Sequence, residues 1–222
     1  MLLRRRWYFE PGGQQLTVQL NDEPPMPWNL GDGQGNEPGV RETTFALRGC
    51  RSGANRVTIR YARGGNCAGY RIEPLASSAV PLERWGAINA KQTKGRYETD
   101  RSAVGTPLAI GKANYAAGLG THAASFVEYP LDGQFDKFEV TVGVDGSTEG
   151  RGSVQFRVYV DGKLRADSGT LSGFSPAKTL NVEKLGEAKR LLLSVTDGGD
   201  GNKFDLANWV DGKLYLKERK AP

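Results

Sequence analysis

The fold class is decided by the run Phe138-Glu-Val-Thr-Val-Gly-Val144 and, one loop later, by Val154-Gln-Phe-Arg-Val-Tyr-Val160. In both runs every second residue is apolar, and most of the residues between them are polar or small. This period of two predicts β-strands that turn one face toward a core. Asp161-Gly162 follows the second run and recurs as Asp211-Gly212. Because tight hairpins prefer this dipeptide, both copies predict a hairpin turn.

Further strands are expected in the same half of the chain, at 179–182, 191–195 and 213–216. Short strands separated by turn residues at this spacing predict an all-β fold, a β-sandwich of jelly-roll type, over residues 82–222. The 30 glycines and the scarcity of leucine-rich helical stretches agree with that fold class. A chain of 222 residues is long enough for such a sandwich to bury a sizeable core.

Residues 1–81 are expected to form a smaller β-rich segment, a partial sandwich. Its expected strands are 15–21, 43–47, 57–61 and 70–72. The run 22–39 is rich in proline and glycine and predicts a long loop, in which Trp28 is either an anchor or an exposed platform. So few strands make a thin sandwich, and we expect this segment to pack against another part of the protein or a neighbour.

Composition excludes several classes of function. The net charge is +5, but the basic residues are dispersed, with Arg4–Arg6 as the one tight cluster, so no nucleic-acid partner is predicted. No run approaches the roughly 20 apolar residues that span a bilayer, and the N-terminus does not read as a signal peptide. Cys50 and Cys67 favour a disulfide that closes a hairpin, with two free thiols as the alternative.

The first candidate for a functional site is Gly118-Leu-Gly-Thr-His-Ala-Ala-Ser125, which holds the only histidine of the chain. Glycine lets a partner approach the main chain closely, so Gly118 and Gly120 suggest that Thr121 and His122 are presented in a fixed way. The alternative is a histidine whose hydrogen bonds serve the structure alone.

A second candidate is the loop 196–209, which gathers three aspartates, two asparagines and Trp209 among glycines. Carboxylate and amide oxygens are ligands that Ca²⁺ prefers, although EF-hand spacing fails from Asp197 and from Asp200. The alternative is a turn network in which Asp and Asn cap their own backbone. Catalysis by Asp200 and Asp205 as a carboxylate pair is the weaker interpretation, because nothing in the sequence indicates a buried acid with a raised pKa.

Several separate motifs resemble one known family, in matching order. They are Gly105-Thr-Pro-Leu-Ala-Ile-Gly111, Tyr115–Ser125, Val142-Gly-Val-Asp145, Gly152-Ser-Val-Gln-Phe-Arg-Val158, Asp161-Gly-Lys163, and Thr196-Asp-Gly-Gly-Asp-Gly201 with Asp205 and Trp209. Over about residues 82–216 the chain resembles the NPCBM domain, carbohydrate-binding module family 51. The resemblance implies a galactose-binding-like β-sandwich that is non-catalytic, is usually attached to glycoside hydrolases, and is directed at galactose and blood-group type glycans.

A pyranose has hydroxyl groups and an apolar face, so its site needs hydrogen-bonding side chains beside an aromatic ring. The residues expected to bind carbohydrate are Trp85, Arg96, Glu98, Thr121, His122, Asp200, Asn202, Asp205 and Trp209. For both tryptophans the alternative is core packing, which we favour for Trp209. The expected ligands of a structural Ca²⁺ ion are Asp145, Glu149 and Asp197.

Two departures from the family pattern concern the ligand. Gly146 stands where the family has a second acidic residue, with Glu149 further on, and Leu206 and Asn208 replace a histidine and an aspartate. The retained glycines and Trp209 preserve the fold. A rival interpretation is therefore a structural or interaction domain whose sugar site has been lost.

We predict a carbohydrate-binding module for galactose-type glycans, not an enzyme, with a glycoside hydrolase domain or subunit as partner and a secreted or periplasmic location. Residues 14–20, 45–47 and 56–60 also show a faint likeness to the closing sandwich of DUF2961-type glycoside hydrolases. That likeness implies the tail of a larger carbohydrate-active enzyme, or a relative of such an enzyme that lost its catalytic half.

Overall fold

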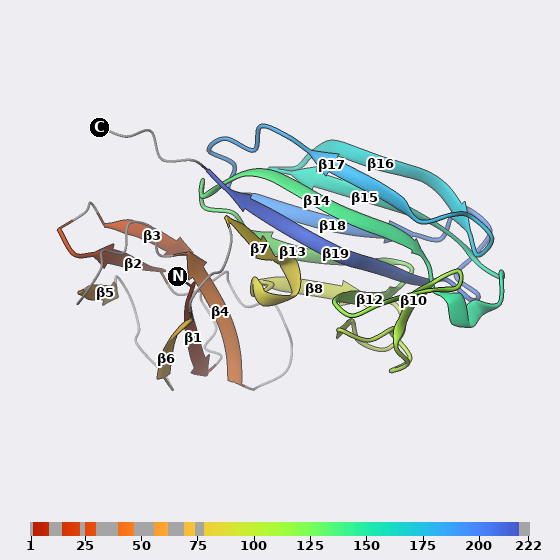
Figure 1. Cartoon of the computed structure of the whole chain (residues 1–222), viewed down its shortest axis with the longest axis horizontal. Helices are drawn as coiled ribbons and strands as arrows, with labels where there is room; N and C mark the ends of the chain where they lie inside the picture. Colours follow the sequence, from red (N-terminus) through yellow and green to blue (C-terminus); the bar gives the residue numbers. More distant parts are fainter. Residues whose placement is uncertain are drawn as a thin grey trace.

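The computed structural model describes residues 2–8, 15–22, 25–29, 40–46, 56–61, 69–73 and 78–217. Nearly all of the regular structure in these ranges is β-strand (Figure 1). The helical elements among them are two single 3₁₀ turns, η1 (Leu82–Arg84) and η2 (Gly146–Thr148). Among the same residues, no helix is long and apolar enough to cross a membrane. The expected all-β class is confirmed.

Residues 78–217 form a sandwich of two antiparallel sheets. The order of the first sheet is β17 (Lys178–Val182), β14 (Phe135–Val144), β19 (Leu206–Leu216), β12 (Gly118–His122) and β9 (Glu98–Thr99), with β7 (Ala79–Pro81) also paired to β19. The order of the second is β16 (Lys163–Ser172), β15 (Ser153–Val160), β18 (Arg190–Thr196), β13 (Ser125–Pro130) and β8 (Asn89–Gln92). A small hairpin is made by β10 (Leu108–Ile110) and β11 (Ala113–Tyr115). Since β7 belongs to the first sheet, the sandwich begins three residues before the expected boundary at 82.

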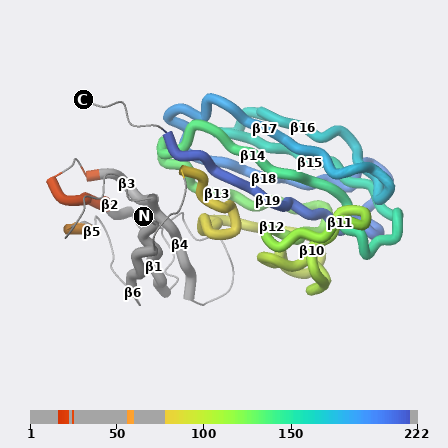
Figure 2. Tube along the Cα trace, viewed as in Figure 1, coloured from red at the N-terminus to blue at the C-terminus, as the bar shows by residue number. Residues whose placement is uncertain are grey.

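The two alternating runs supply the centre of the core. Phe138, Val140 and Val142 of β14 and Val154, Phe156 and Val158 of β15 all have exposed fractions of 0%. The residues between them turn outward, as a period of two requires. The expected inward face of both strands is confirmed, and Figure 2 shows β14 lying along β19, which follows it by some 60 residues in the chain.

The two Asp-Gly dipeptides for which a hairpin was expected, Asp161-Gly162 and Asp211-Gly212, have different structural roles. Asp161 and Gly162 join β15 to β16 with positive φ angles of 47° and 78°, so the expected hairpin is confirmed there. The expected hairpin at Asp211-Gly212 is wrong, because both residues lie inside β19. Asp211 has φ 53° where the register against β14 shifts, so this copy makes a β-bulge.

The first segment contains two three-stranded antiparallel sheets. One has the order β4 (Val40–Ala46), β1 (Leu2–Tyr8), β6 (Gly69–Glu73), and the other β3 (Met26–Asn29), β2 (Gln15–Leu20), β5 (Val57–Tyr61). Four of these strands lie where they were expected, whereas β1 was missed. The long loop expected at 22–39 is interrupted by β3, which includes Trp28. Cys50 and Cys67 lie outside the described residues.

Candidate functional site

Five loops meet at one end of the sandwich, the end beside η2 at the right of Figure 1. They comprise residues 93–97, 123–124, 145–152, 173–177 and 197–205. Backbone hydrogen bonds join them: Ala123 N donates to Asp205 O at 3.0 Å, Gly173 N to Gly152 O at 3.2 Å, and Thr93 N to Ala124 O at 3.0 Å. The two stretches singled out in the sequence, around His122 and 196–209, therefore lie at the same end, which we call the loop end.

Asp205 is the buried centre of the loop end. Its exposed fraction is 0%, its Oδ1 accepts a hydrogen bond from Ser153 N at 3.0 Å, and its Oδ2 is buried without a hydrogen-bond partner. Burial raises the pKa of Asp205 to about 6, and the negative charges of Asp200 and Asp197 add to the rise. Nothing in the sequence indicated such an acid, so that expectation is corrected. An acid fully enclosed by protein does not flank a glycosidic bond, which argues against the catalytic carboxylate pair.

His122 is the last residue of β12, paired with Leu206 of β19, and has an exposed fraction of 8%. Its Nδ1 lies 2.7 Å from Ala123 O, and because a carbonyl only accepts, Nδ1 carries the proton and donates. The backbone N–H of His122 also donates to Gln92 Oε1 at 3.4 Å. The hydrogen bond to Ala123 O fixes the orientation of the ring, whereas the flanking glycines admit other backbone: Gly118 lies against Trp209, and Gly120 against Arg101 and Ser102.

Two phenylalanines that the sequence analysis missed supply exposed rings at the loop end. The exposed fractions of Phe174 and Phe204 are 84% and 37%. Both rings contact one short segment: Phe174 lies so close to Gly150 that a Cβ there would sit 2.2 Å from its Cζ, and the guanidinium of Arg151 lies 4.1 Å from the centroid of Phe204. Each phenylalanine interrupts a loop of polar and small residues, and that pattern was the available sequence signal.

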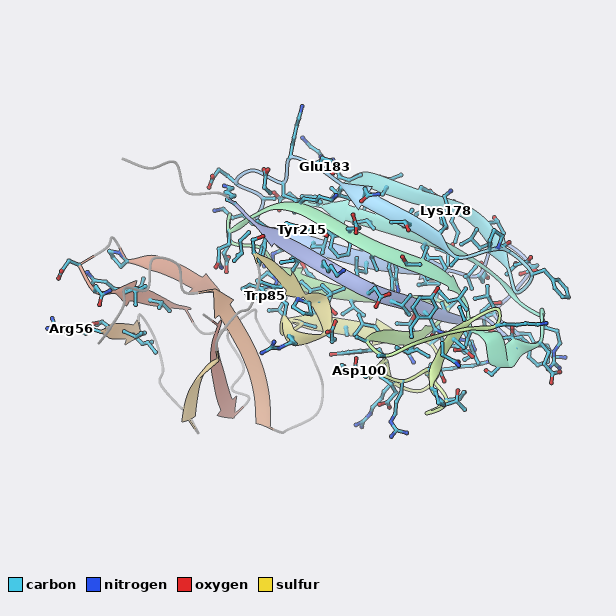
Figure 3. All side chains as sticks on the ribbon, in the orientation of Figure 1. Arg56, Trp85, Asp100, Lys178, Glu183 and Tyr215 are labelled. Atoms are coloured by element: carbon cyan, nitrogen blue, oxygen red, sulfur yellow. The ribbon has the colours of Figure 1, made fainter. Side chains whose placement is uncertain are left out.

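The two tryptophans expected to bind sugar lie in the core instead. Trp85 is 1% exposed, packs edge-on against Phe135 with centroids 4.9 Å apart, and donates from Nε1 to Pro130 O at 2.6 Å. Trp209 is 1% exposed and packs edge-on against Phe156, also at 4.9 Å. Figure 3 shows Trp85 toward the end of the sandwich away from η2. Neither ring has a face for a sugar, because core side chains cover both faces. The expected sugar contact of Trp85 is therefore wrong, whereas for Trp209 the alternative that we favoured, core packing, is confirmed.

The other expected sugar-binding residues divide into structural and exposed groups. Thr121 is buried and donates from Oγ1 to Ala207 O at 3.1 Å, which is a structural role. Arg96 and Glu98 are exposed, in the loop after β8 and in β9, and Glu98 pairs with Gly120 across the sheet. Asp200 is exposed and Asn202 is half-buried in the loop before β19. The exposed ones remain candidates for contact with a ligand.

The three expected calcium ligands do not form a site. Asp145 is 1% exposed and already occupied: its Oδ1 accepts from Ser147 N at 2.9 Å, and its Oδ2 accepts from Asn208 Nδ2 at 2.5 Å. Glu149 pairs with Arg151 at 3.3 Å, and Asp197 accepts from Gly199 N at 3.2 Å. Within the described ranges, no group of three or more acidic, histidine or cysteine side chains is placed to hold a metal ion.

Comparison with known proteins agrees with this architecture. The model of the NPCBM/NEW2 domain matches residues 79–215. Alpha-1,3-galactosidase B of Akkermansia muciniphila is 32% identical over 135 residues, 60% of this chain and 17% of that protein. A putative endo-alpha-N-acetylgalactosaminidase of Renibacterium salmoninarum is 30% identical over 143 residues, 64% of this chain and 9% of that protein. The chain thus spans less than a fifth of the length of either curated relative.

Solved structures of CBM51 modules superpose on this chain as well. The CBM51 module of a Clostridium perfringens GH95 protein, in complex with methyl-galactose, superposes with a TM-score of 0.58 at 33% identity, covering 61% of this chain and 99% of that one. CBM51-2 with the INT domains of Clostridium perfringens ZmpB, in complex with GlcNAc, has a TM-score of 0.60 at 24% identity, covering 90% of this chain and 40% of that one. The second likeness shows the fold alone.

Proposed function

The chain belongs to the NPCBM/NEW2 family, and from that premise we infer that it is a non-catalytic carbohydrate-binding module that recognises galactose-type glycans. The methyl-galactose complex of the similar CBM51 module supports the sugar class. The curated relatives, named as a galactosidase and an N-acetylgalactosaminidase, support association with a glycoside hydrolase. A secreted or periplasmic location belongs to the same proposal, because polymeric and surface-bound glycans lie outside the cytoplasm.

One observation carries the assignment of the site to the loop end. The exposed rings of Phe174 and Phe204 contact the same segment, residues 150–152, and exposed Asp200 and half-buried Asn202 belong to the same loop as Phe204. An apolar ring face next to charged and amide groups is what a pyranose needs, because its C–H face packs on the ring while its hydroxyls hydrogen-bond to the polar groups. Phe174, at 84%, has the highest exposed fraction among the large exposed apolar side chains of the described residues, so its ring is accessible to a ligand.

We expect Phe174→Ala to weaken galactoside binding about tenfold, which corresponds to about 1.4 kcal/mol. Because the ring is exposed, the free energy of unfolding should change by no more than about 0.5 kcal/mol. Isothermal titration with methyl-galactoside, lactose and a blood-group trisaccharide measures the affinity, and thermal unfolding measures the stability. Phe204→Ala and His122→Ala extend the map to the loop 197–205 and to the end of β12.

Val104→Ala is the matched control, since Val104 is also an exposed apolar residue, at 59%, but lies outside the five loops. Equal binding by wild type and Phe174→Ala would contradict the placement of the site. Absence of heat with every sugar, from a folded protein, would instead favour the structural or interaction domain.

We also propose that a structural cation such as Ca²⁺ would act at Asp205, not at Asp145, Glu149 and Asp197 together. The support is the buried Oδ2 without a partner, in a loop that also holds Asp197 and Asp200. Because no three such side chains converge within the described ranges, the remaining donors would be main-chain carbonyls and water.

Calcium chloride at pH 7.5 is therefore expected to raise the midpoint of thermal unfolding of the wild type by several degrees relative to EDTA. Asp205→Asn keeps an acceptor for Ser153 N–H but removes the charge, so its midpoint should be the same in calcium and in EDTA. Asp161→Asn, a change of an exposed aspartate in the β15–β16 turn, is the control. A wild type that is indifferent to calcium would refute the cation site.

A further inference from the structure

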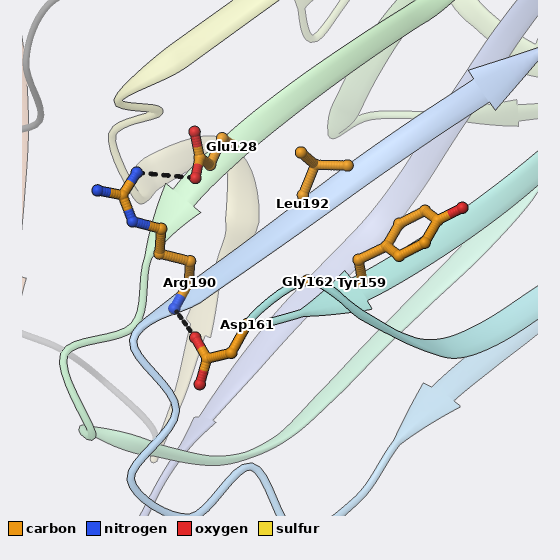
Figure 4. Close-up of a pocket in the computed structure, with 6 residues that line it drawn as sticks. All are labelled: Glu128, Tyr159, Asp161, Gly162, Arg190 and Leu192. Carbon is orange, nitrogen blue, oxygen red and sulfur yellow. Dashed lines mark hydrogen bonds and ion pairs between the residues drawn. The ribbon is translucent and has the colours of Figure 1, made fainter.

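A hollow lies on the outer face of the five-stranded sheet, at the opposite end from the loop end. Its volume is about 370 Å³, and it is lined by Glu128, Tyr159, Asp161, Gly162, Arg190 and Leu192. Figure 4 shows Leu192 between Tyr159 on one side and Glu128 with Arg190 on the other, and Arg190 joined to Glu128. The volume is within the range of small-molecule sites, which begins near roughly 300 Å³.

Strand register brings the lining residues to one face. Leu192 of β18 stands directly opposite Glu128 of β13 on one side and Tyr159 of β15 on the other. Residues opposite one another on neighbouring strands point to the same face, so the three form one row across the sheet. With strands roughly 4.8 Å apart, the row is about 10 Å long. Arg190 precedes Leu192 by two residues and therefore shares that face.

The turn that closes the hollow is fixed in place. The Asp161 carboxylate accepts from Arg190 N at 2.8 Å and from Lys189 N at 3.0 Å, and Asp161 N donates to Arg190 O at 3.1 Å. The β15–β16 hairpin is thereby tied to the first residues of β18. Because both walls belong to hydrogen-bonded strands, the hollow is formed before any ligand arrives.

We propose that this hollow is a second saccharide subsite of the same module. The apolar row of Tyr159 and Leu192 accommodates the C–H face of one pyranose ring. The Glu128 carboxylate and the Arg190 guanidinium, 2.9 Å apart, place an acceptor and a fork of donors beside the ring, where vicinal hydroxyls would lie. The inference rests on the proposed function, since the ligand is the same class of galactose-type glycan.

The two sites are separate in space. β15 begins at the loop end with Ser153, and Tyr159 stands six residues further along. At roughly 3.3 Å per residue the separation is about 20 Å, which exceeds the length of a disaccharide. A module with two subsites at opposite ends would bind a branched or clustered glycan more tightly than either subsite alone.

The proposal is tested by titrating ¹⁵N-labelled protein with lactose and recording the amide signals by NMR. We expect two sets of amide signals to shift: one around Phe174, Phe204 and Arg151, and one around Tyr159, Gly162 and Leu192. Tyr159→Ala should weaken the lactose affinity measured from the second set of signals at least tenfold and leave the affinity measured from the first set unchanged. Phe174→Ala should weaken the affinity measured from the first set and leave that of the second set unchanged. Glu128→Gln, which keeps the shape of the side chain, covers the case in which Tyr159→Ala does not fold.

Tyr215→Ala is the matched control, because Tyr215 is a partly buried tyrosine of the other sheet. Shifts confined to the loop-end set would overturn the second subsite and leave the proposed function standing. Shifts confined to the Tyr159 set would support the subsite and overturn the assignment of the loop end. If glycerol moved the Tyr159 signals as lactose does, the hollow would be a nonspecific polyol site and the inference would fail.

Discussion

Replacement of Trp209 by alanine is expected to lower the free energy of unfolding by about 3–5 kcal/mol. The side chain is 1% exposed and meets Phe156 edge-on across the two sheets, so truncation leaves a cavity at the centre of the core. Trp209 is the fourth residue of β19, with Leu119 of β12 and Val142 of β14 beside it. Because its ring is buried between the sheets, we expect the truncation to affect stability and not the sugar affinity of the folded protein.

Denaturant unfolding of the wild type, Trp209→Ala and Trp209→Phe measures this effect. The phenylalanine variant keeps most of the apolar volume and should lose less than half as much stability, which keeps the comparison usable where the alanine variant is too unstable. Sugar affinity is measured on the fraction that is folded and should equal that of the wild type. A stable Trp209→Ala protein that has lost sugar binding would show that the ring is part of the binding site after all.

Asn208→Asp is expected to destabilise the protein by about 3 kcal/mol at pH 8. Asn208 is 0% exposed, and its Nδ2 donates both to Asp145 Oδ2 at 2.5 Å and to Ala109 O at 2.9 Å. The substitution replaces this donor by a second carboxylate, and two buried carboxylates in contact do not both ionise. One of them must hold a proton in the folded state, so its pKa rises above the unfolded value.

The sign of the pH dependence follows from that raised pKa. Between the unfolded pKa near 4 and the higher folded value, the folded variant binds more protons than the unfolded chain, so its stability falls as pH rises. The loss relative to wild type should therefore be small at pH 4 and large at pH 8, as measured by chemical unfolding at both values. Asn114→Asp, the same change at an exposed position of β11, is the control. A loss that is independent of pH would point to altered packing instead of charge.

The sequence alone determined the central strands and the fold class. The alternation in Phe138–Val144 and Val154–Val160 is a local pattern, and a strand with period-two apolar residues has one favourable arrangement, with that face buried. The turn at Asp161-Gly162 was predictable for the same reason, since two residues with positive φ are a local requirement of a tight hairpin. The family motifs added the galactose-binding-like sandwich.

Only the tertiary structure decided the roles of residues whose chemistry suits two environments. A tryptophan serves equally as a core residue or a sugar platform, and Trp85 and Trp209 became core residues because the opposite sheet covers them. Asp211-Gly212 became a bulge because β14 runs alongside β19 on both sides of it. Phe174 joined the loop end because Gly150, 24 residues earlier, lies beneath its ring. Strand pairing between distant residues sets each of these outcomes, and no local pattern encodes which strands will pair.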